Sequence, residues 1–456
     1  MAVIRKRLIF WLIKAYIKKS GKTLVLSFFV GLLAFFGIMY FSQHIAQLFP
    51  FSTKQSIGLV GAYTQDNLPK EVVSNLSIGL TTVSDDGSIE PGLAESWETT
   101  DSGKVYTFTL KDNQYFNNGE RVTSGSINYD FSDVEVERPD EKTIIYKLQD
   151  AYAPFLVTVS RPVFASNYTG VGNYHIDDVE LNGNFVQSLT LAEVENRQNT
   201  IHYEFYPTEE ALKMAYLLGE VSEIRGLTAG TYDDTRFEDF PNTKVVISPN
   251  DERLVTLFYD TTDPVLSEKK LRLSLTYALP NEFSQGQRSR LPYSPRSIYY
   301  NSETLLRNQD INHAQLLLLP DESASDSAYN APPKELTIKT LPKYKKVAEK
   351  VAEAWRQLDI KTTIEEVSEV PNEFQIFLGD FTLPRDPDQY TIWHSDQRNN
   401  ITHYKNLRID KLLEDGRKTT NEKDRIELYK DFQRYLLEDA PAAFLYFPTE
   451  YTIVRK

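Results

Sequence analysis

Two stretches near the middle of the first half of the chain decide how the rest is interpreted: residues 91–98 read PGLAESWE and residues 106–127 read YTFTLKDNQYFNNGERVTSGSI. The second stretch lies in strand-like sequence. Residues 105–110 (VYTFTL) and 143–148 (TIIYKL) place β-branched and aromatic residues at alternating positions, which is typical of strands. The region from 57 to 165 is therefore predicted to consist mainly of strands and turns.

Turn signals separate these runs. Asp85-Asp86-Gly87 and Asp101-Ser102-Gly103 both combine turn-forming residues with a glycine. The first triplet lacks the ligand spacing and the distal glutamate of a calcium-binding loop, so a plain turn is the better interpretation.

The second half of the chain alternates between helical and strand patterns. Residues 345–358 place Val347, Val351, Trp355 and Leu358 on one stripe, which predicts an amphipathic helix. A second helix is predicted at 267–279, and strands are predicted at 361–367 and 373–378. Alternating helices and strands indicate an α/β fold.

The charge of the chain is unevenly distributed. The formal net charge of the 456 residues is -14, yet the first 22 residues contain seven Lys or Arg and no acid. Without those seven, 43 basic residues face 64 acidic ones, so the remainder carries a net charge of about -21. An acidic body argues against nucleic-acid binding, and the basic head suits an anionic membrane face. The absence of cysteine excludes disulfides, thiolate metal sites and a lipidated N-terminal cysteine.

An apolar segment follows the basic head. Residues 24–42 read LVLSFFVGLLAFFGIMYFS, without a charged residue. As a helix the segment would be about 28 Å long, enough to cross the hydrocarbon core of a bilayer. A cleaved signal peptide is the alternative, but the segment is long for one and no small-x-small cleavage site follows. The positive-inside rule predicts a single-pass anchor in a bacterial cell membrane, with a cytoplasmic N-terminus and an extracytoplasmic body.

Two shorter segments flank this span. Within the basic head (residues 1–23), residues 4–19 contain an apolar stretch that is too short to cross a bilayer. They form either an interfacial amphipathic helix or a simple basic flank. Residues 43–56 are predicted to be a linker that reaches at most about 45–50 Å, which keeps the body near the membrane.

Signatures of catalysis and of cofactor binding are missing from the sequence. The six histidines show no HExxH spacing. The chain contains no GxGxxG, GxxxxGK[ST] or GxSxG motif. We therefore expect no cofactor, no metal site and no enzymatic activity. Asp386 and Asp388, which flank Pro387, resemble a catalytic pair, but a solvated turn explains them equally well.

The aromatic residues point to binding. The chain has 27 Tyr and 25 Phe, most of which are expected in the core. Some lie in polar, proline-rich sequence that suits a wet binding cleft: Tyr293, Tyr299, Tyr300, Tyr390 and Trp393. Packing beneath long loops is the alternative for each of them.

Taken in order, several segments resemble the family 5 extracellular solute-binding proteins, the oligopeptide and dipeptide group. PGLAESWE and the stretch at 106–127 resemble the signature of this family. Further similar segments are APFL at 153–156, GVGNY at 170–174, residues 257–279, residues 314–319, DPD at 386–388, IDKLL at 409–413 and DAPAAFLYFP at 439–448. The resemblance covers residues 57–456.

The resemblance implies an α/β fold with two lobes that close around a ligand about a hinge, a periplasmic-binding-protein-like fold of type II, similar to cluster C. Lobe 1 is expected at 57–256, with a domain II at about 78–165. Lobe 2, or domain III, is expected at 257–439, and residues 440–456 are expected to return to lobe 1. The first crossing between the lobes is expected near 257–260.

The resemblance also implies a ligand site. In dipeptide-binding members an aspartate of the DPD segment captures the amine of the ligand, and an uncapped carboxylate would pair with an ammonium through a charge-assisted hydrogen bond. The peptide backbone is held like an added strand. An aromatic residue beside the DPD segment would cover a side chain, and a loop after the first strand faces the ligand. The candidate ligand-binding residues are Asp386, Asp388, Trp393, Tyr390, Tyr63 and Thr64.

The chain departs from the family in two respects. The lipobox cysteine is absent and an apolar span takes its place. Only fifteen residues join Ile127 to Thr143, where the family usually has a helical insertion. Domain II is therefore expected to be trimmed, and no arginine can be assigned to a ligand carboxylate.

The sequence thus predicts a membrane-anchored, extracytoplasmic receptor of an ABC-type importer that binds peptides or a similar small solute. Its expected partners are this solute, ABC permease subunits and the lipid bilayer, but no nucleic acid. One alternative is a surface interaction or sensory protein that keeps the fold without transport. Another is a hydrolase that uses Asp386 and Asp388.

Overall fold

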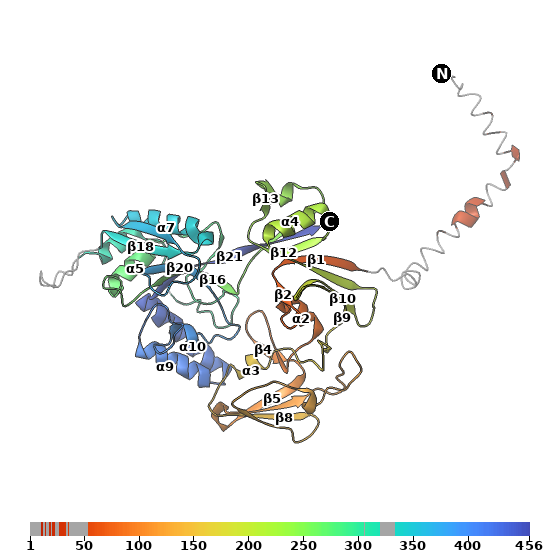
Figure 1. Cartoon of the computed structure of the whole chain (residues 1–456), viewed down its shortest axis with the longest axis horizontal. Coiled ribbons are helices and arrows are strands. Elements are labelled where there is room, and N and C mark those ends of the chain that lie inside the picture. The colour runs from red at the N-terminus through yellow and green to blue at the C-terminus, as the bar shows by residue number, and fades with distance from the viewer. Residues whose placement is uncertain are drawn as a thin grey trace. The chain divides into compact units, whose positions relative to one another are not determined.

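The computed structural model describes residues 53–304, 306–319 and 333–456, together with residues 11, 14, 18, 19, 21, 22, 27–32 and 35 (Figure 1). The chain divides into two units. One contains residues 1–54 and 198–200, and the other contains residues 55–197 and 201–456. The second unit holds the folded body, and the features below belong to it.

The predicted membrane span falls mainly outside the described residues. Residues 27–32 are helical, and within the described positions no helix is both long enough and apolar enough to cross a bilayer. Most of 24–42, most of the segment 4–19 and residues 43–52 of the linker are not among the described positions. The anchor, the interfacial helix and the linker up to residue 52 therefore stay predictions. The end of the linker was expected at residue 56, but residues 54–56 already belong to the first strand, Lys54–Val60.

In the described part of the chain, one mixed sheet of 13 strands runs through the body (Figure 1). We call residues 55–249 and 449–456 lobe 1, and residues 253–447 lobe 2. In lobe 1 the strand order is β12, β1, β11, β10 and β2, and β9 pairs with β10. Buried residues of two helices, such as Val72 of α2 and Leu212 of α4, contribute to the lobe 1 core. The bounds are β1 Lys54–Val60, β2 Tyr63–Thr64, α2 Lys70–Leu76, β9 Tyr174–Asn182, β10 Phe185–Glu193, β11 Thr200–Tyr206, α4 Glu209–Leu218, β12 Glu223–Leu227 and β15 Thr243–Pro249.

A small antiparallel sheet extends lobe 1, with the strand order β5, β6, β8 and β7. Alternate residues of its strands point into one core, where Tyr106, Phe108, Tyr146 and Phe155 pack ring against ring. The two strands predicted at 105–110 and 143–148 are confirmed as β6 and β8. The bounds are β3 Thr81–Val83, β4 Ile89–Pro91, β5 Ala94–Thr100, β6 Val105–Leu110, β7 Val134–Glu137, β8 Thr143–Leu148 and α3 Phe155–Thr158.

Lobe 2 is α/β. Its part of the sheet has the order β19, β18, β20 and β16, and both β19 and β20 lie parallel to β18. The helix predicted at 345–358 is confirmed as α7, whose Trp355 is fully buried and donates its indole N–H to the Leu275 carbonyl at 2.9 Å. The bounds are β16 Arg253–Tyr259, α5 Lys269–Tyr277, β17 Gly286–Arg288, α6 Ile311–Leu317, β18 Glu335–Thr340, α7 Lys345–Arg356, β19 Lys361–Glu366, β20 Ile376–Thr382, α8 Tyr390–Trp393, α9 Leu407–Lys418 and α10 Glu422–Asp439.

Two crossings join the lobes. The long strand β21 (Ala442–Arg455) pairs with β16 through residues 442–446 and with β15 through residues 449–455, so it belongs to both lobes (Figure 1). The other crossing is Asn250–Glu252, between β15 and β16. The Asn250 N–H donates to the Pro448 carbonyl at 2.8 Å, which holds the two crossings side by side. The first crossing therefore precedes the expected position at 257–260 by several residues.

The remaining elements are short. They are β13 Thr231–Tyr232, β14 Thr235–Arg236 and the 3-10 helices η1 Asp101–Gly103, η2 Ser124–Ser126, η3 Phe237–Asp239 and η4 Pro342–Tyr344.

Candidate functional site

A cavity of about 360 Å³ opens where the two crossings meet both lobes. Lobe 1 contributes the turn between β3 and β4 (residues 83–87), and the crossings contribute residues 249–252 and Glu450. Lobe 2 contributes residues from two loops, 293–297 and 383–387. Because both lobes form its wall, a solute in this cavity would contact both at once.

The turn between β3 and β4 is built as its sequence predicts. Gly87 has a φ of +87°, a conformation that glycine adopts without strain. The Ser88 hydroxyl and N–H donate to the Asp86 carboxylate at 2.7 and 2.9 Å, and these bonds hold the pKa of Asp86 below its usual range. The Asp86 carbonyl accepts a hydrogen bond from the Ile298 N–H at 2.9 Å, so this turn of lobe 1 touches lobe 2.

A second cavity, of about 190 Å³, lies between the small sheet and lobe 2. Its lobe 1 wall is largely apolar, with contributions from Trp97, Tyr106, Leu156 and Val157. Its lobe 2 wall includes an aromatic ring and an ion pair. Gly87 lines both cavities, which makes the two neighbours.

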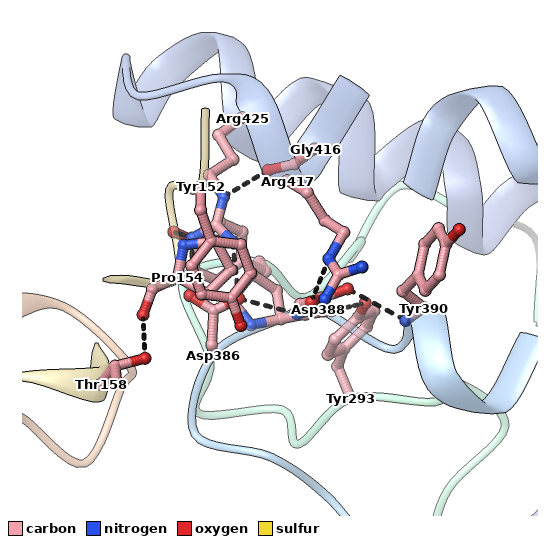
Figure 2. A network of polar contacts seen from close by, with 12 residues as sticks. Tyr152, Pro154, Thr158, Tyr293, Asp386, Asp388, Tyr390, Gly416, Arg417 and Arg425 are labelled. Atoms are coloured by element: carbon pink, nitrogen blue, oxygen red, sulfur yellow. Dashed lines mark hydrogen bonds and ion pairs between the residues drawn. The ribbon is translucent and has the colours of Figure 1, made fainter. Parts of the chain in front are cut away.

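Asp386, the first predicted ligand residue, lies in the wall of the smaller cavity but is not an uncapped carboxylate. Its two oxygens accept hydrogen bonds from both terminal nitrogens of Arg425, at 2.8 and 2.5 Å (Figure 2). The two side chains are only 8% and 7% exposed. The Arg425 Nε–H donates to the Gly416 carbonyl at 2.8 Å, which fixes the guanidinium. The carboxylate is therefore capped and not free as expected, and a ligand ammonium would have to compete with a bidentate guanidinium. Binding of a ligand by Asp386 stays a prediction.

Asp388, the second predicted ligand residue, is also paired. Its Oδ2 lies 2.9 Å from the Nε of Arg417, and its Oδ1 accepts the Tyr390 N–H at 3.0 Å (Figure 2). Burial raises the pKa of Asp388, and the charge of Arg417 offsets this only in part. The physical reason for both pairings is the same: a carboxylate removed from water needs a partner.

Arg417 also connects the lobes. Its guanidinium carbon lies 4.2 Å from the centre of the Tyr390 ring in lobe 2 and 5.2 Å from that of the Tyr152 ring in lobe 1. Its carbonyl accepts the Ala153 N–H of lobe 1 at 2.6 Å. The C-terminal end of α9, where Arg417 lies, therefore takes part in the contact between the lobes.

Trp393 lies in the core of lobe 2. It is fully buried, donates its indole N–H to Gln389 at 2.9 Å and packs against Phe258 and Phe444. In this arrangement other side chains cover its ring, as in the alternative of packing beneath a loop. Tyr390 is half-buried and stacks on His394 with ring centres 4.1 Å apart.

Tyr63 and Thr64 form β2 at the end of the lobe 1 sheet. They pair with Val186 and Phe185 of β10, and the Tyr63 ring packs edge-on against Phe205. Neither residue is among those that line the two cavities. Burial raises the pKa of the Tyr63 hydroxyl, with a smaller contribution from the charge of Glu71.

Sequence reasoning missed five charged residues that line the larger cavity: Asp251, Glu252, Arg296, Arg385 and Glu450. The first crossing was expected several residues later, so no pattern pointed to Asp251 or Glu252. The turn at Asp85-Asp86-Gly87 was identified, but nothing local shows that it reaches the other lobe. The described residues contain no group of three or more His, Asp and Glu that could hold a metal ion.

Comparisons with known proteins fit this architecture. A family model described as "Bacterial extracellular solute-binding proteins, family 5 Middle" matches residues 88–133. The oligopeptide-binding proteins AppA and OppA of Bacillus subtilis (strain 168) are each 22% identical to the chain, over 458 and 468 residues. The AppA match covers 85% of this chain and 84% of the relative, and the OppA match covers 84% of each. The crystal structure of the ABC transporter substrate-binding protein CtaP from Listeria monocytogenes matches with a TM-score of 0.71 and 18% identity, over 89% of this chain and 94% of that one.

The chain is therefore similar to family 5 solute-binding proteins over residues 88–133 and to oligopeptide-binding proteins over most of its length. The expected two-lobed, periplasmic-binding-protein-like α/β fold is confirmed. The matching family model is described by solute binding and the relative AppA by oligopeptide binding, so the comparisons lend no support to a hydrolase that uses Asp386 and Asp388.

Proposed function

We propose that the chain is the receptor of an ABC-type importer that binds a peptide, or a similar small solute, in the cavity between its lobes. The observation that carries this proposal is the cavity itself, whose wall is shared by lobe 1, lobe 2 and both crossings. Its volume of about 360 Å³ falls within the range of typical ligand pockets. The relatives AppA and OppA are named for oligopeptide binding, which favours a peptide as the solute.

Hinge closure is part of this proposal, and the position of the two crossings supports it. Asn250–Glu252 and the middle of β21 are the covalent links between the lobes, and they lie side by side. Rotation about them would separate contacts such as Ile298 with Asp86 and Ala153 with Arg417. A solute that contacts both walls favours the closed form by its differential affinity for that form.

The predicted ligand residues enter this proposal in different ways. Asp386 shapes the smaller cavity through its pair with Arg425, and Asp388 and Tyr390 hold Arg417 at the contact between the lobes. Direct contact of a solute with Trp393, Tyr63 or Thr64 stays a prediction. We also propose that domain II is trimmed, that residues 24–42 anchor the chain in the cell membrane and that permease subunits receive the solute there.

A binding screen tests the receptor function. Purified full-length protein in detergent micelles is titrated with a peptide library and followed by native mass spectrometry and thermal unfolding. At a free concentration of 100 Kd, a bound peptide should raise the free energy of unfolding by about 2.7 kcal/mol.

A cavity-filling variant locates the site. Ser297 lines the larger cavity, so Ser297→Trp should abolish binding, while Ser267→Trp at an exposed position of the same lobe should leave it intact. Equal binding by both variants would place the peptide elsewhere. If no solute binds the unmodified protein, the receptor proposal fails, and a sensory or interaction role takes its place.

A further inference from the structure

A third cavity, of about 20 Å³, lies within lobe 2, and three arginines line it: Arg288, Arg290 and Arg307. The rest of its wall comes from residues of α5, α10 and the beginning of β21. Among the described residues of this wall there is no Asp or Glu. Three cationic side chains therefore surround one small space without an acidic one.

The hydrogen-bond partners of the three arginines are neutral. Arg288 donates to backbone carbonyls of β21, at 2.5 and 2.6 Å. Arg290 donates to the Arg307 carbonyl at 2.9 Å and to the side-chain oxygen of Asn281 at 2.8 Å. Arg307 donates to a carbonyl of α10 at 2.5 Å. Within the described ranges none of the three forms an ion pair, so only partial charges offset three full ones.

One donor of Arg288 has no partner. The residue as a whole is half-buried, but its Nε is enclosed and meets no acceptor in the part of the chain that the structure describes. Burial lowers the pKa of Arg288 to about 9, and the charge of Arg290 lowers it further. Buried donors are normally paired, and a buried cation without a counter-charge is costly. The surroundings of Arg288 therefore call for a negatively charged acceptor.

The size of the cavity selects the acceptor. A space of about 20 Å³ holds one particle the size of a water molecule, which needs roughly 10–15 Å³. Phosphate and sulfate, with four oxygens each, do not fit. A water molecule would accept the Nε–H but would leave the charges unbalanced. A monatomic anion would do both, and chloride is the common one in water.

We propose that Arg288, Arg290 and Arg307 form a binding site for a single monatomic anion, chloride. The anion accepts the Nε–H of Arg288 and offsets the charges of the three guanidinium groups. No residue that lines this cavity lines either of the other two. The inference therefore does not depend on the proposed receptor function.

The anion holds a long irregular segment onto lobe 2. Arg288 is the last residue of β17 and lies opposite Tyr446 of β21. Arg290 and Arg307 belong to the connection between β17 and α6, whose described residues form neither helix nor strand. Since an unfolded chain does not gather these arginines around one space, chloride binds the folded form and stabilises it.

Thermal unfolding measures this effect. The full-length protein in a non-ionic detergent is unfolded at constant ionic strength while sodium chloride replaces sodium gluconate, whose anion is too large for the cavity. Constant ionic strength keeps general screening equal. The unfolding midpoint should rise by about 1–3 °C for each tenfold increase in chloride above its Kd.

Three variants assign the effect to the cavity. Arg288→Met removes the unpaired Nε–H, and Arg307→Gln removes a charge at a half-buried position, so each should abolish the dependence on chloride. If Arg288→Met does not fold, Arg307→Gln decides. Arg356→Met replaces an exposed arginine of α7 outside the cavity and should keep the full dependence.

Bromide locates the ion directly. In crystals grown from a bromide salt, anomalous diffraction should show a peak beside the Nε of Arg288. Equal unfolding midpoints in chloride and gluconate would overturn the inference, as would a cavity that holds only water. Equal chloride dependence of Arg307→Gln and Arg356→Met would also overturn it, because the ion would then be adventitious and bound elsewhere.

Discussion

Asp386 and Arg425 are both buried, and burial determines what each can do. Removing two charges from water costs several kcal/mol per ion, and the cost is recovered only when the geometry is good and the remaining polar atoms are satisfied. Here the contact is bidentate, and the Arg425 Nε–H and the Asp386 Oδ1 have further partners in the backbone of Gly416 and Asp388. The pair therefore shapes the smaller cavity without offering a free charge to it.

Removal of one partner should be costly. Arg425→Met leaves the Asp386 carboxylate buried without a counter-ion, and we expect a loss of about 3–5 kcal/mol in the free energy of unfolding. The double variant Asp386→Leu with Arg425→Met should be clearly more stable than this single variant, because it removes both charges. Denaturant unfolding followed by circular dichroism measures these differences.

An exposed pair on the same helix is the control. Arg434 and Asp431 are about half exposed, so Arg434→Met should cost at most about 1 kcal/mol. Equal costs for Arg425→Met and Arg434→Met would show that the buried pair has no special role.

Sequence reasoning located Asp386 and Asp388 but assigned them the wrong surroundings. The DPD segment was identified through its resemblance, which marks a position in the fold. The partners Arg417 and Arg425 lie 29 and 39 residues further along, on α9 and α10, and nothing local pairs them with the aspartates. Trp393 shows the same limit, since a polar neighbourhood in sequence does not reveal burial in space.

Local patterns predicted single elements far better. β6 and β8 match the predicted runs to the residue, because alternation along a strand depends only on which face is buried. The stripe of Val347, Val351 and Trp355 likewise predicted α7, and all three residues are buried. These local patterns do not show which strands pair with one another. Nothing in the sequence pattern therefore indicates that β21 pairs with strands of both lobes.

The two glycines of the GVGNY segment, residues 170–174, are explained by a close contact between backbones. Gly172 donates its N–H to the Leu76 carbonyl at 2.8 Å, next to the C-terminal end of α2. A Cβ on Gly170 would lie 2.0 Å from the same carbonyl oxygen, which is too close for any side chain. These glycines let the backbone pass against the end of the helix.

Gly170→Ala should therefore destabilise the fold by about 1–3 kcal/mol, the usual cost of overpacking a tight contact. Gly125→Ala is the matched control, since its nearest atom would be a threonine hydroxyl at 3.6 Å, and we expect little change. Thermal unfolding of both variants beside the unmodified protein measures the difference. A Gly170→Ala protein as stable as the Gly125→Ala protein would contradict the close approach.

At the scale of the whole molecule, the two crossings set what the lobes can do together. The covalent links at Asn250–Glu252 and in the middle of β21 are the region about which the proposed rotation of one lobe against the other would take place. Two charged residues of the first link, Asp251 and Glu252, line the larger cavity. The expected boundary at 256/257 falls within β16. The resembling segment begins at residue 257, inside this strand, and so does not indicate where the strand starts.

Topology across the membrane is the prediction that belongs to the whole chain. The chain has no cysteine, so a single introduced thiol reports its side of the membrane without background. In protoplasts or spheroplasts, a membrane-impermeant maleimide should label Asn128→Cys, at an exposed position of the body, and should leave Ser20→Cys unlabelled until the cells are lysed. We expect this because seven cationic residues precede residues 24–42, and the positive-inside rule places such a flank on the cytoplasmic side. Labelling of both variants before lysis would contradict the orientation, and release of a body that lacks residue 20 would show a cleaved signal peptide in place of an anchor.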